Sequence, residues 1–463
     1  MVVGTMIGSG IFIVSADMSR QLDSWGPGGL LVVWAITGLM TVTGALAYAE
    51  LAAMMPTAGG QYVFLRDGLS PLIGFLFGWT LFTVIQTGTI AAVAVAFGKF
   101  LGVLLPSVTP DIFLSLGHVP MPGGTIELGL SWQRIVALGV VAVLTLINLR
   151  GVTLGARVQT VFAVAKVGAL AAVILLGLTL FRRPEVWAGN AAGFWGTGDW
   201  SLLVVPAFGA AMVGSLFSAD AWNNVTFAAA EVRDPRRNLP LALGLGTAVV
   251  MVLYLLMNVA YLEVLPFKGD PAGIDALARG IQYAAEDRVS VAAAESMVGP
   301  VGGVLMAVAI MLSTFGCVNG LVLAGPRVYY AMAKDRLFFR RAGELHPAWR
   351  TPVLGLVAQA LWAMVLCLSG TYGNLLDYVI FASLLFYFFT VLALFRLRRI
   401  QPDLPRPVKA LGYPVLPALY MAAVLALLVI LLFRKPLYTW PGLLIVALGV
   451  PIYLIWRRGR NTG

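Results

Sequence analysis

Gly4–Phe12 reads GTMIGSGIF and crowds three glycines and one serine into seven residues of a strongly apolar stretch. A glycine inside a helix costs about 1 kcal/mol relative to alanine, so this density requires a reason. Gly4 and Gly8 form a G-x-x-x-G pair, which is typical of close packing between membrane helices. The same glycines would also suit a helix that ends and restarts inside the membrane. This stretch alone leaves both interpretations open.

The composition indicates a protein that spans a membrane many times. Of the 463 residues, 60% are hydrophobic and 11% are charged, whereas soluble domains carry about 25% charged residues. The excess of basic residues gives a net charge of +10, but their distribution favours a topological role over binding of nucleic acid or of anionic lipid. Two cysteines and two histidines provide no disulfide framework, metal site or cofactor site.

Apolar windows of about 20 residues predict transmembrane helices, and the pattern lacks the alternating polarity of a membrane barrel. We expect an all-α polytopic protein, a single transmembrane domain over 1–463, with about twelve spans. The predicted spans are 1–20, 28–55, 71–104, 132–149, 157–181, 201–231, 240–263, 296–333, 352–370, 374–396, 413–433 and 438–457.

The basic residues predict the orientation of these spans. Most of the 31 lysines and arginines fall in segments that are cytoplasmic if the N-terminus is cytoplasmic. Cytoplasmic loops carry the excess of such residues, so both termini are expected in the cytoplasm.

One external loop, 272–286, has the pattern of an amphipathic helix. Its shared face would consist of Ile274, Leu277, Ala278, Ile281 and Ala285. Such a helix would either dip into an outer vestibule or lie at the membrane surface without a role in gating.

A second interruption appears at Gly214–Phe227, which reads GSLFSADAWNNVTF. Paired interruptions at matching places mark transporters that are built from inverted repeats. With spans 1–5 (1–182) as the first repeat and spans 6–10 (201–396) as the second, each interruption lies in the first helix of its repeat. The last two spans, 413–457, would be additional. The pairing favours broken helices over packing glycines.

Broken helices expose backbone amides and carbonyls at one depth, where lipid cannot satisfy them. The N-terminus of a half-helix favours an anion such as a carboxylate, and free carbonyls accept hydrogen bonds from an ammonium group. A pocket with both fits a zwitterionic α-amino acid. Asp220, within the second interruption, is either a carboxylate paired inside the bundle or a functional group.

Five stretches carry a family resemblance: 2–12 (VVGTMIGSGIF), 47–79 (AYAELAAMMPTAGGQYVFLRDGLSPLIGFLFGW), 216–243 (LFSADAWNNVTFAAAEVRDPRRNLPLAL), 317–339 (CVNGLVLAGPRVYYAMAKDRLFF) and 346–352 (HPAWRTP). In this order they resemble the amino acid–polyamine–organocation superfamily, and within it the L-type amino acid transporter branch. The resemblance implies the five-plus-five inverted-repeat fold of leucine-transporter type with two further helices. It also implies a multi-pass protein of a bacterial-type inner membrane.

The resemblance implies a site as well. The carboxylate of the substrate would meet the amides of Ser9, Gly10 and Ile11, and its amino group the carbonyls of Ile7 and of Phe217, Ser218 or Asp220. Phe217 resembles the aromatic outer gate of the family. The implied substrate-binding set is Ile7, Gly8, Ser9, Gly10, Ile11, Phe217, Ser218 and Asp220.

Lys166 lies within the fifth span, about nine residues from its start and therefore about 13 Å deep at the rise of an α-helix. Related sodium-independent transporters carry a lysine here whose ammonium replaces a sodium ion. Its expected partners are carbonyls near Gly4 and Ile7 and the hydroxyls of Ser313 or Thr314. The alternative is a side chain that snorkels to the cytoplasmic face or to water.

These features predict a sodium-independent exchanger of L-α-amino acids that works by alternating access, and not an enzyme. The alternative is a proton-coupled symporter or antiporter of amino acids, or of cationic amino acids or polyamines. The external segment 105–131 lacks cysteine, so no disulfide-linked heavy subunit is expected. The chain departs from the family pattern in two ways. Asp220 stands where several relatives carry glycine, and only a few residues precede the first break.

Overall fold

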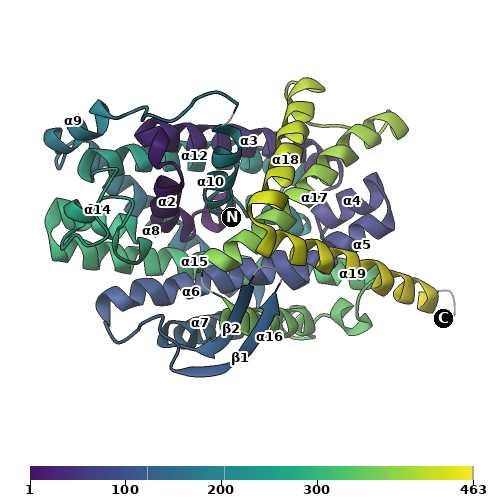
Figure 1. Cartoon of the computed structure of the whole chain (residues 1–463). Helices are drawn as coiled ribbons and strands as arrows, with labels where there is room; N and C mark the ends of the chain where they lie inside the picture. The colour runs from purple at the N-terminus through teal and green to yellow at the C-terminus, as the bar shows by residue number, and fades with distance from the viewer. Residues whose placement is uncertain (122–123, 203, 371, 461–463) are drawn as a thin grey trace.

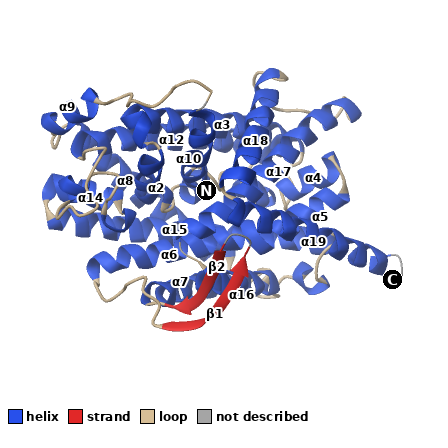
Figure 2. Ribbon diagram, viewed as in Figure 1, coloured by secondary structure: helices blue, strands red, loops and turns tan. Residues whose placement is uncertain are grey.

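The computed structural model describes residues 1–121, 124–202, 204–370 and 372–460. Most of them are helical (Figures 1 and 2). Within the described residues the only strands are β1 (Leu114–Met121) and β2 (Gly124–Leu130), which form an antiparallel hairpin. This confirms the prediction of an all-α polytopic membrane protein, although the hairpin was not predicted.

The helices run in the following order: α1 Val2–Met6, α2 Gly10–Gln21, η1 Asp23–Trp25, α3 Gly26–Met54, α4 Gln61–Gly68, α5 Pro71–Thr80, η2 Leu81–Ile85, α6 Gln86–Leu104, α7 Trp132–Leu149, α8 Val152–Leu178, α9 Pro184–Ala192, α10 Val204–Ser218, α11 Asn224–Phe227, η3 Ala229–Glu231, α12 Pro235–Val264, α13 Ala276–Arg279, η4 Ala285–Asp287, α14 Val289–Val298, α15 Pro300–Lys334, η5 Arg340–Gly343, α16 Val353–Ser369, α17 Tyr372–Ile400, α18 Val415–Arg434 and α19 Pro436–Arg460.

Each of the predicted spans contains helix, but not every one of these helices is long enough to cross a membrane. Among the described residues, nine helices are long and apolar enough to cross a membrane. The other three predicted spans hold interrupted or shorter helices: α1 with α2, α10 with α11, and the 17-residue α16. The number of twelve therefore stays a prediction.

Two predictions for the external segments are wrong. The helix predicted over 272–286 is reduced to the four-residue α13, because Gly280 adopts φ +57°, which ends the helix, and Ile274 is exposed. The span predicted from residue 296 begins at Pro300, because Gly299 at φ +74° separates α14 from α15. Positive φ is readily adopted by glycine and stops a right-handed helix.

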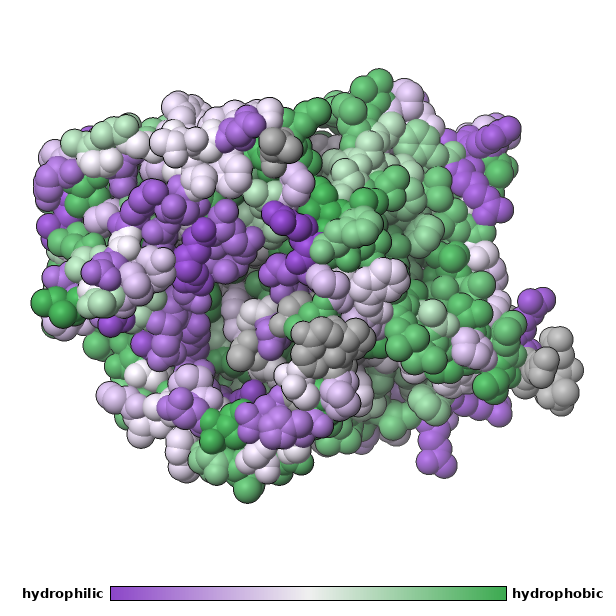
Figure 3. Space-filling model, in the orientation of Figure 1, coloured by the Kyte–Doolittle hydropathy of each residue, from purple (hydrophilic) through white to green (hydrophobic). Residues whose placement is uncertain are grey.

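The interrupted helices lie at the centre of the bundle. α1 contacts α8, α12 and α15, while α10 contacts α2, α3, α17 and α18. The hairpin packs against α16 below α6 in the view of Figure 1. Hydrophobic residues dominate the surface around α18, while hydrophilic residues gather over the left and centre of the same face (Figure 3). The hydrophobic part of this surface is suited to contact with lipid, which cannot satisfy polar groups.

One end of the bundle is held by ion pairs. The fully buried Glu50 of α3 accepts hydrogen bonds at 2.9 and 2.5 Å from Arg398 at the end of α17. Arg406 lies 3.4 Å from the same carboxylate, and the Ala410 amide donates to it at 2.6 Å. The loop after α17 is thereby tied to α3.

We predict that Glu50→Gln lowers the stability of the folded protein. The substitution would leave two arginines without their counterion, and removing one partner of a buried pair costs about 3–5 kcal/mol. Arg398 remains 20% exposed, which places the loss toward the lower end. Thermal unfolding of the purified protein in detergent would measure it. Asp403→Asn, an exposed substitution in the same loop, serves as the control, and equal melting temperatures for the two variants would contradict the prediction.

Candidate functional site

The first helix breaks within the glycine-rich stretch. α1 ends at Ile7, whose backbone (φ −74°, ψ 88°) is no longer helical, and α2 begins at Gly10. Within the described residues, no protein group accepts a hydrogen bond from the amides of Ser9, Gly10 or Ile11. These amides form the first turn of α2, where the helix dipole is positive.

The carbonyls of the same break are satisfied by side chains from other helices. The Nζ of Lys166 (α8) donates to the carbonyls of Gly4 at 2.8 Å and Ile7 at 2.6 Å. Ser313 (α15) donates to the carbonyls of Ile7 and Gly8, both at 3.2 Å. Lys166 is 1% exposed, which excludes the alternative of a snorkelling ammonium.

Three further contacts complete this pattern. Cys317 (α15) donates from its Sγ to the Thr5 carbonyl at 3.1 Å, and the Tyr254 hydroxyl (α12) donates to the Met6 carbonyl at 3.0 Å. The Gly8 amide also donates to Met6, at 2.8 Å. The break therefore has its acceptors occupied and its donors free, which suits an anionic ligand.

Thr314 does not take the expected place beside Lys166. Its hydroxyl donates to the carbonyls of Ile310 and Met311 on its own helix, both at 3.0 Å. In the described part of the chain no hydrogen bond joins Thr314 to the lysine, so of the two expected hydroxyls only Ser313 shares a carbonyl with it.

The second interruption lies between Ser218, where α10 ends, and Asn224, where α11 begins. The Phe217 carbonyl accepts the Asp220 amide at 3.2 Å. The carbonyls of Ser218 and Asp220 receive no hydrogen bond from any described residue. This break therefore complements the first one, because it offers free acceptors at the C-terminal end of a helix.

The two breaks are in direct contact. A Cβ added to Gly10 would lie 2.2 Å from the Oγ of Ser218 and 2.8 Å from its Cα. Thr5 of α1 donates to the Ala221 carbonyl at 3.0 Å. A Cβ added to Gly8 would lie 3.0 Å from Cys317 Sγ. The glycines therefore permit close packing as well as the break, and both interpretations of the sequence contribute.

Two tyrosines of α17 complete the surroundings, and sequence reasoning missed both. The ring of Phe217 lies edge-on to Tyr372, with centroids 5.8 Å apart. The hydroxyl of Tyr372 accepts a hydrogen bond from Ser9 at 3.2 Å. Tyr387 donates to the Asp220 carboxylate. No local sequence signal distinguishes either tyrosine, because their roles arise from the packing of α17 against the breaks.

Asp220 is a buried carboxylate whose charge has no basic partner among the described residues. Its side chain is bonded to Tyr387, whereas the other buried acids, Glu50 and Glu263, form ion pairs with arginines. The described residues therefore give the Asp220 carboxylate hydrogen-bond donors, Tyr387 among them, but no cation. A buried ionisable group of this kind is costly and marks a functional position.

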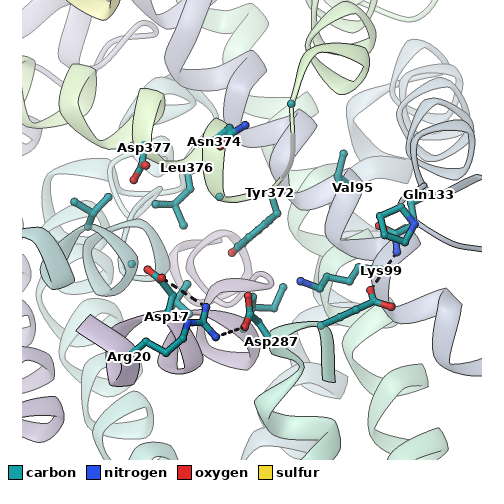
Figure 4. Close-up of a pocket in the computed structure, with 18 of the residues that line it drawn as sticks. Asp17, Arg20, Val95, Lys99, Gln133, Asp287, Tyr372, Asn374, Leu376 and Asp377 are labelled. Carbon is teal, nitrogen blue, oxygen red and sulfur yellow. Dashed lines mark hydrogen bonds and ion pairs between the residues drawn. The ribbon is translucent and has the colours of Figure 1, made fainter. Parts of the chain in front are cut away.

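A cavity of about 490 Å³ at one end of the bundle reaches Tyr372, whose ring packs against Phe217 (Figure 4). Tyr372 lines it, as do the ends of α2, α6 and α17 and the loop at Glu286. Its charged lining residues are Asp17, Glu286, Asp287, Asp377, Arg20, Lys99, Arg134 and Lys435. Acids and bases are equal in number there, and several are paired with each other: Arg20 with Asp17 and Asp287, and Lys435 with Asp377.

The opposite end of the bundle is closed. Tyr62 (α4) donates to Asp335 at 2.7 Å, and Arg66 donates to the same carboxylate. Burial raises the pKa of Tyr62 above its usual value, so this hydroxyl remains a donor at neutral pH. Arg327 (α15) holds Glu231 with two hydrogen bonds at 2.7 and 2.8 Å.

A membrane-embedded bundle with a polar site between two broken helices, open to one side and closed to the other, defines a transporter of small solutes. The comparisons identify the class further. The profile of the amino acid permease family matches residues 1–455, and the chain belongs to this family. The family membership confirms the prediction of an amino acid transporter rather than an enzyme.

Individual relatives agree with this assignment. The chain is 31% identical to the mouse (Mus musculus) and human (Homo sapiens) large neutral amino acids transporter small subunit 2 over 459 residues, which are 98% of this chain and 78% of the relative. It is 28% identical to the mouse b(0,+)-type amino acid transporter 1 over 441 residues, which are 95% of this chain and 81% of that protein.

We predict that Gly10→Ala impairs substrate binding without preventing insertion. The new methyl group would collide with Ser218, and overpacking of this kind costs about 1–3 kcal/mol, or roughly a 5- to 100-fold loss of affinity. Binding of radiolabelled amino acids to the purified variant would measure the loss. Gly139→Ala adds the same methyl group where no atom lies within 4 Å and should bind normally. Unchanged binding by Gly10→Ala would contradict the assignment.

Proposed function

We propose that this protein is a sodium-independent exchanger of L-α-amino acids that works by alternating access. One observation carries the proposal: free amides at the first break face free carbonyls at the second. This pairing of donors and acceptors matches the carboxylate and ammonium groups of an α-amino acid.

In the proposed complex, the substrate carboxylate binds the amides of Ser9, Gly10 and Ile11. The substrate ammonium binds the carbonyls of Ser218 and Asp220, with Phe217 covering the pair. The Ile7 carbonyl already accepts from Lys166 and Ser313, which use both of its lone pairs. Its contribution to the ammonium is therefore smaller than the resemblance implied.

Lys166 supports independence from sodium. Its ammonium already occupies the position between two carbonyls of the break that a bound cation would take. The ammonium also offers the route to the alternative, a proton-coupled symporter or antiporter, if Lys166 gains and loses its proton during transport. The unpaired carboxylate of Asp220 is the feature that favours cationic substrates or polyamines within that alternative.

We further propose the arrangement in the membrane. Both termini lie in the cytoplasm of a bacterial-type cell, the two repeats cover 1–182 and 201–396, and 413–457 is added to them. The cavity that Tyr372 lines then opens to the outside, and the ion pairs of Glu50 and Glu231 close the cytoplasmic side. No disulfide-linked heavy subunit takes part.

Exchange in proteoliposomes tests the function. Vesicles that contain the purified protein are loaded with unlabelled amino acids or left empty, and uptake of radiolabelled leucine and arginine is measured. We predict uptake only into loaded vesicles, unchanged when choline replaces sodium and unchanged by a pH gradient. Accumulation in empty vesicles driven by a pH gradient would establish the proton-coupled alternative, and a requirement for sodium would contradict the role of Lys166.

A further inference from the structure

A second cavity lies far from the breaks, where α12 begins. It measures about 790 Å³ and is bounded by α3, by the first turns of α12 and by the loop after α17. Three basic residues line it: Arg236 and Arg237 at the start of α12, and Lys409 in the loop. Asp234 is the single acid in its lining, so the net charge of the groove is positive.

The basic side chains of this groove are exposed and have no partner in the described part of the chain. Arg236, Arg237 and Lys409 are exposed, and their side chains form no hydrogen bond or ion pair with any residue that the structure describes. This sets them apart from Arg398 and Arg327, which are engaged by glutamates at the same end of the bundle. Arg236 and Arg237 also lie in the first turn of the 30-residue α12, where the helix dipole adds to the attraction for an anion.

The wall of the groove below these charges is apolar. Leu241, Leu245 and Leu411 are 47%, 65% and 66% exposed, and Leu46 of α3 lies on the opposite wall. At Gly244 a Cβ would lie 3.4 Å from Leu46, so α12 and α3 approach to van der Waals distance at this point of the groove. A small soluble anion such as phosphate would gain no binding energy from this apolar surface.

We propose that this groove binds an anionic glycerophospholipid of the leaflet on which α12 begins. The phosphate group would lie between Arg236, Arg237 and Lys409, and the acyl chains would follow the leucines between α3 and α12. Basic pockets between transmembrane helices, with an apolar surface beside them, are suited to such headgroups. The positive-inside rule explains the presence of basic residues at this end, but not the apolar groove that they surround.

Native mass spectrometry of the full chain in detergent tests the proposal, with phosphatidylglycerol, phosphatidylcholine and inorganic phosphate as separate probes. Wild-type protein should retain phosphatidylglycerol in preference to phosphatidylcholine. The triple variant Arg236→Gln, Arg237→Gln, Lys409→Gln should bind phosphatidylglycerol roughly 100-fold more weakly, since each basic residue near a membrane surface contributes about 1 kcal/mol. Inorganic phosphate should not compete.

The triple variant Arg340→Gln, Arg341→Gln, Arg399→Gln is the matched control, because it removes the same charge from exposed arginines outside the groove. It should bind phosphatidylglycerol as the wild type does. Equal loss in both variants would reduce the effect to net charge and overturn the proposal. Equal retention of both lipids, or competition by inorganic phosphate, would overturn it as well. All substituted residues lie on the surface, so the fold is not at risk.

Discussion

Backbone groups released by a helix break inside a membrane must find partners, because lipid offers none. In the first break this requirement is met for one kind of group only. The carbonyls from Gly4 to Gly8 accept hydrogen bonds from Lys166, Ser313, Cys317, Tyr254 and the local backbone. The amides of Ser9, Gly10 and Ile11 have no acceptor among the residues that the structure describes. The residues around the break therefore hold occupied carbonyls and free amides at the same depth in the membrane.

The contact between the breaks fixes the geometry of the site. Gly10 lies against Ser218 and Thr5 is bonded to the Ala221 carbonyl, so the free donors of one helix and the free acceptors of the other stay adjacent. Because α10 also contacts α17, a shift of α17 would reach both Phe217 and the first break. Tyr372, which is bonded to Ser9 and packed on Phe217, is the residue through which such a shift would act.

Sequence reasoning succeeded where the signal is local. Polar residues and glycines inside apolar stretches marked both breaks, and counting along the span placed Lys166 deep in the membrane. Its carbonyl partners at the first break were expected from the family resemblance. It failed where the apolar periodicity of a helix is interrupted by one glycine with positive φ. The periodicity of 272–286 suggested a helix, but Gly280 at φ +57° ended it. The roles of Tyr372 and Tyr387 could not be found this way, because only the packing of α17 brings them to the site.

A structure of the protein with its transported amino acid bound would test the central claim most directly. The account predicts the carboxylate within hydrogen-bond distance of the amides of Ser9 and Gly10, and the ammonium at the carbonyls that end α10, with Lys166 still bonded to Gly4 and Ile7. An amino acid bound elsewhere in the bundle, with those amides still free, would contradict it.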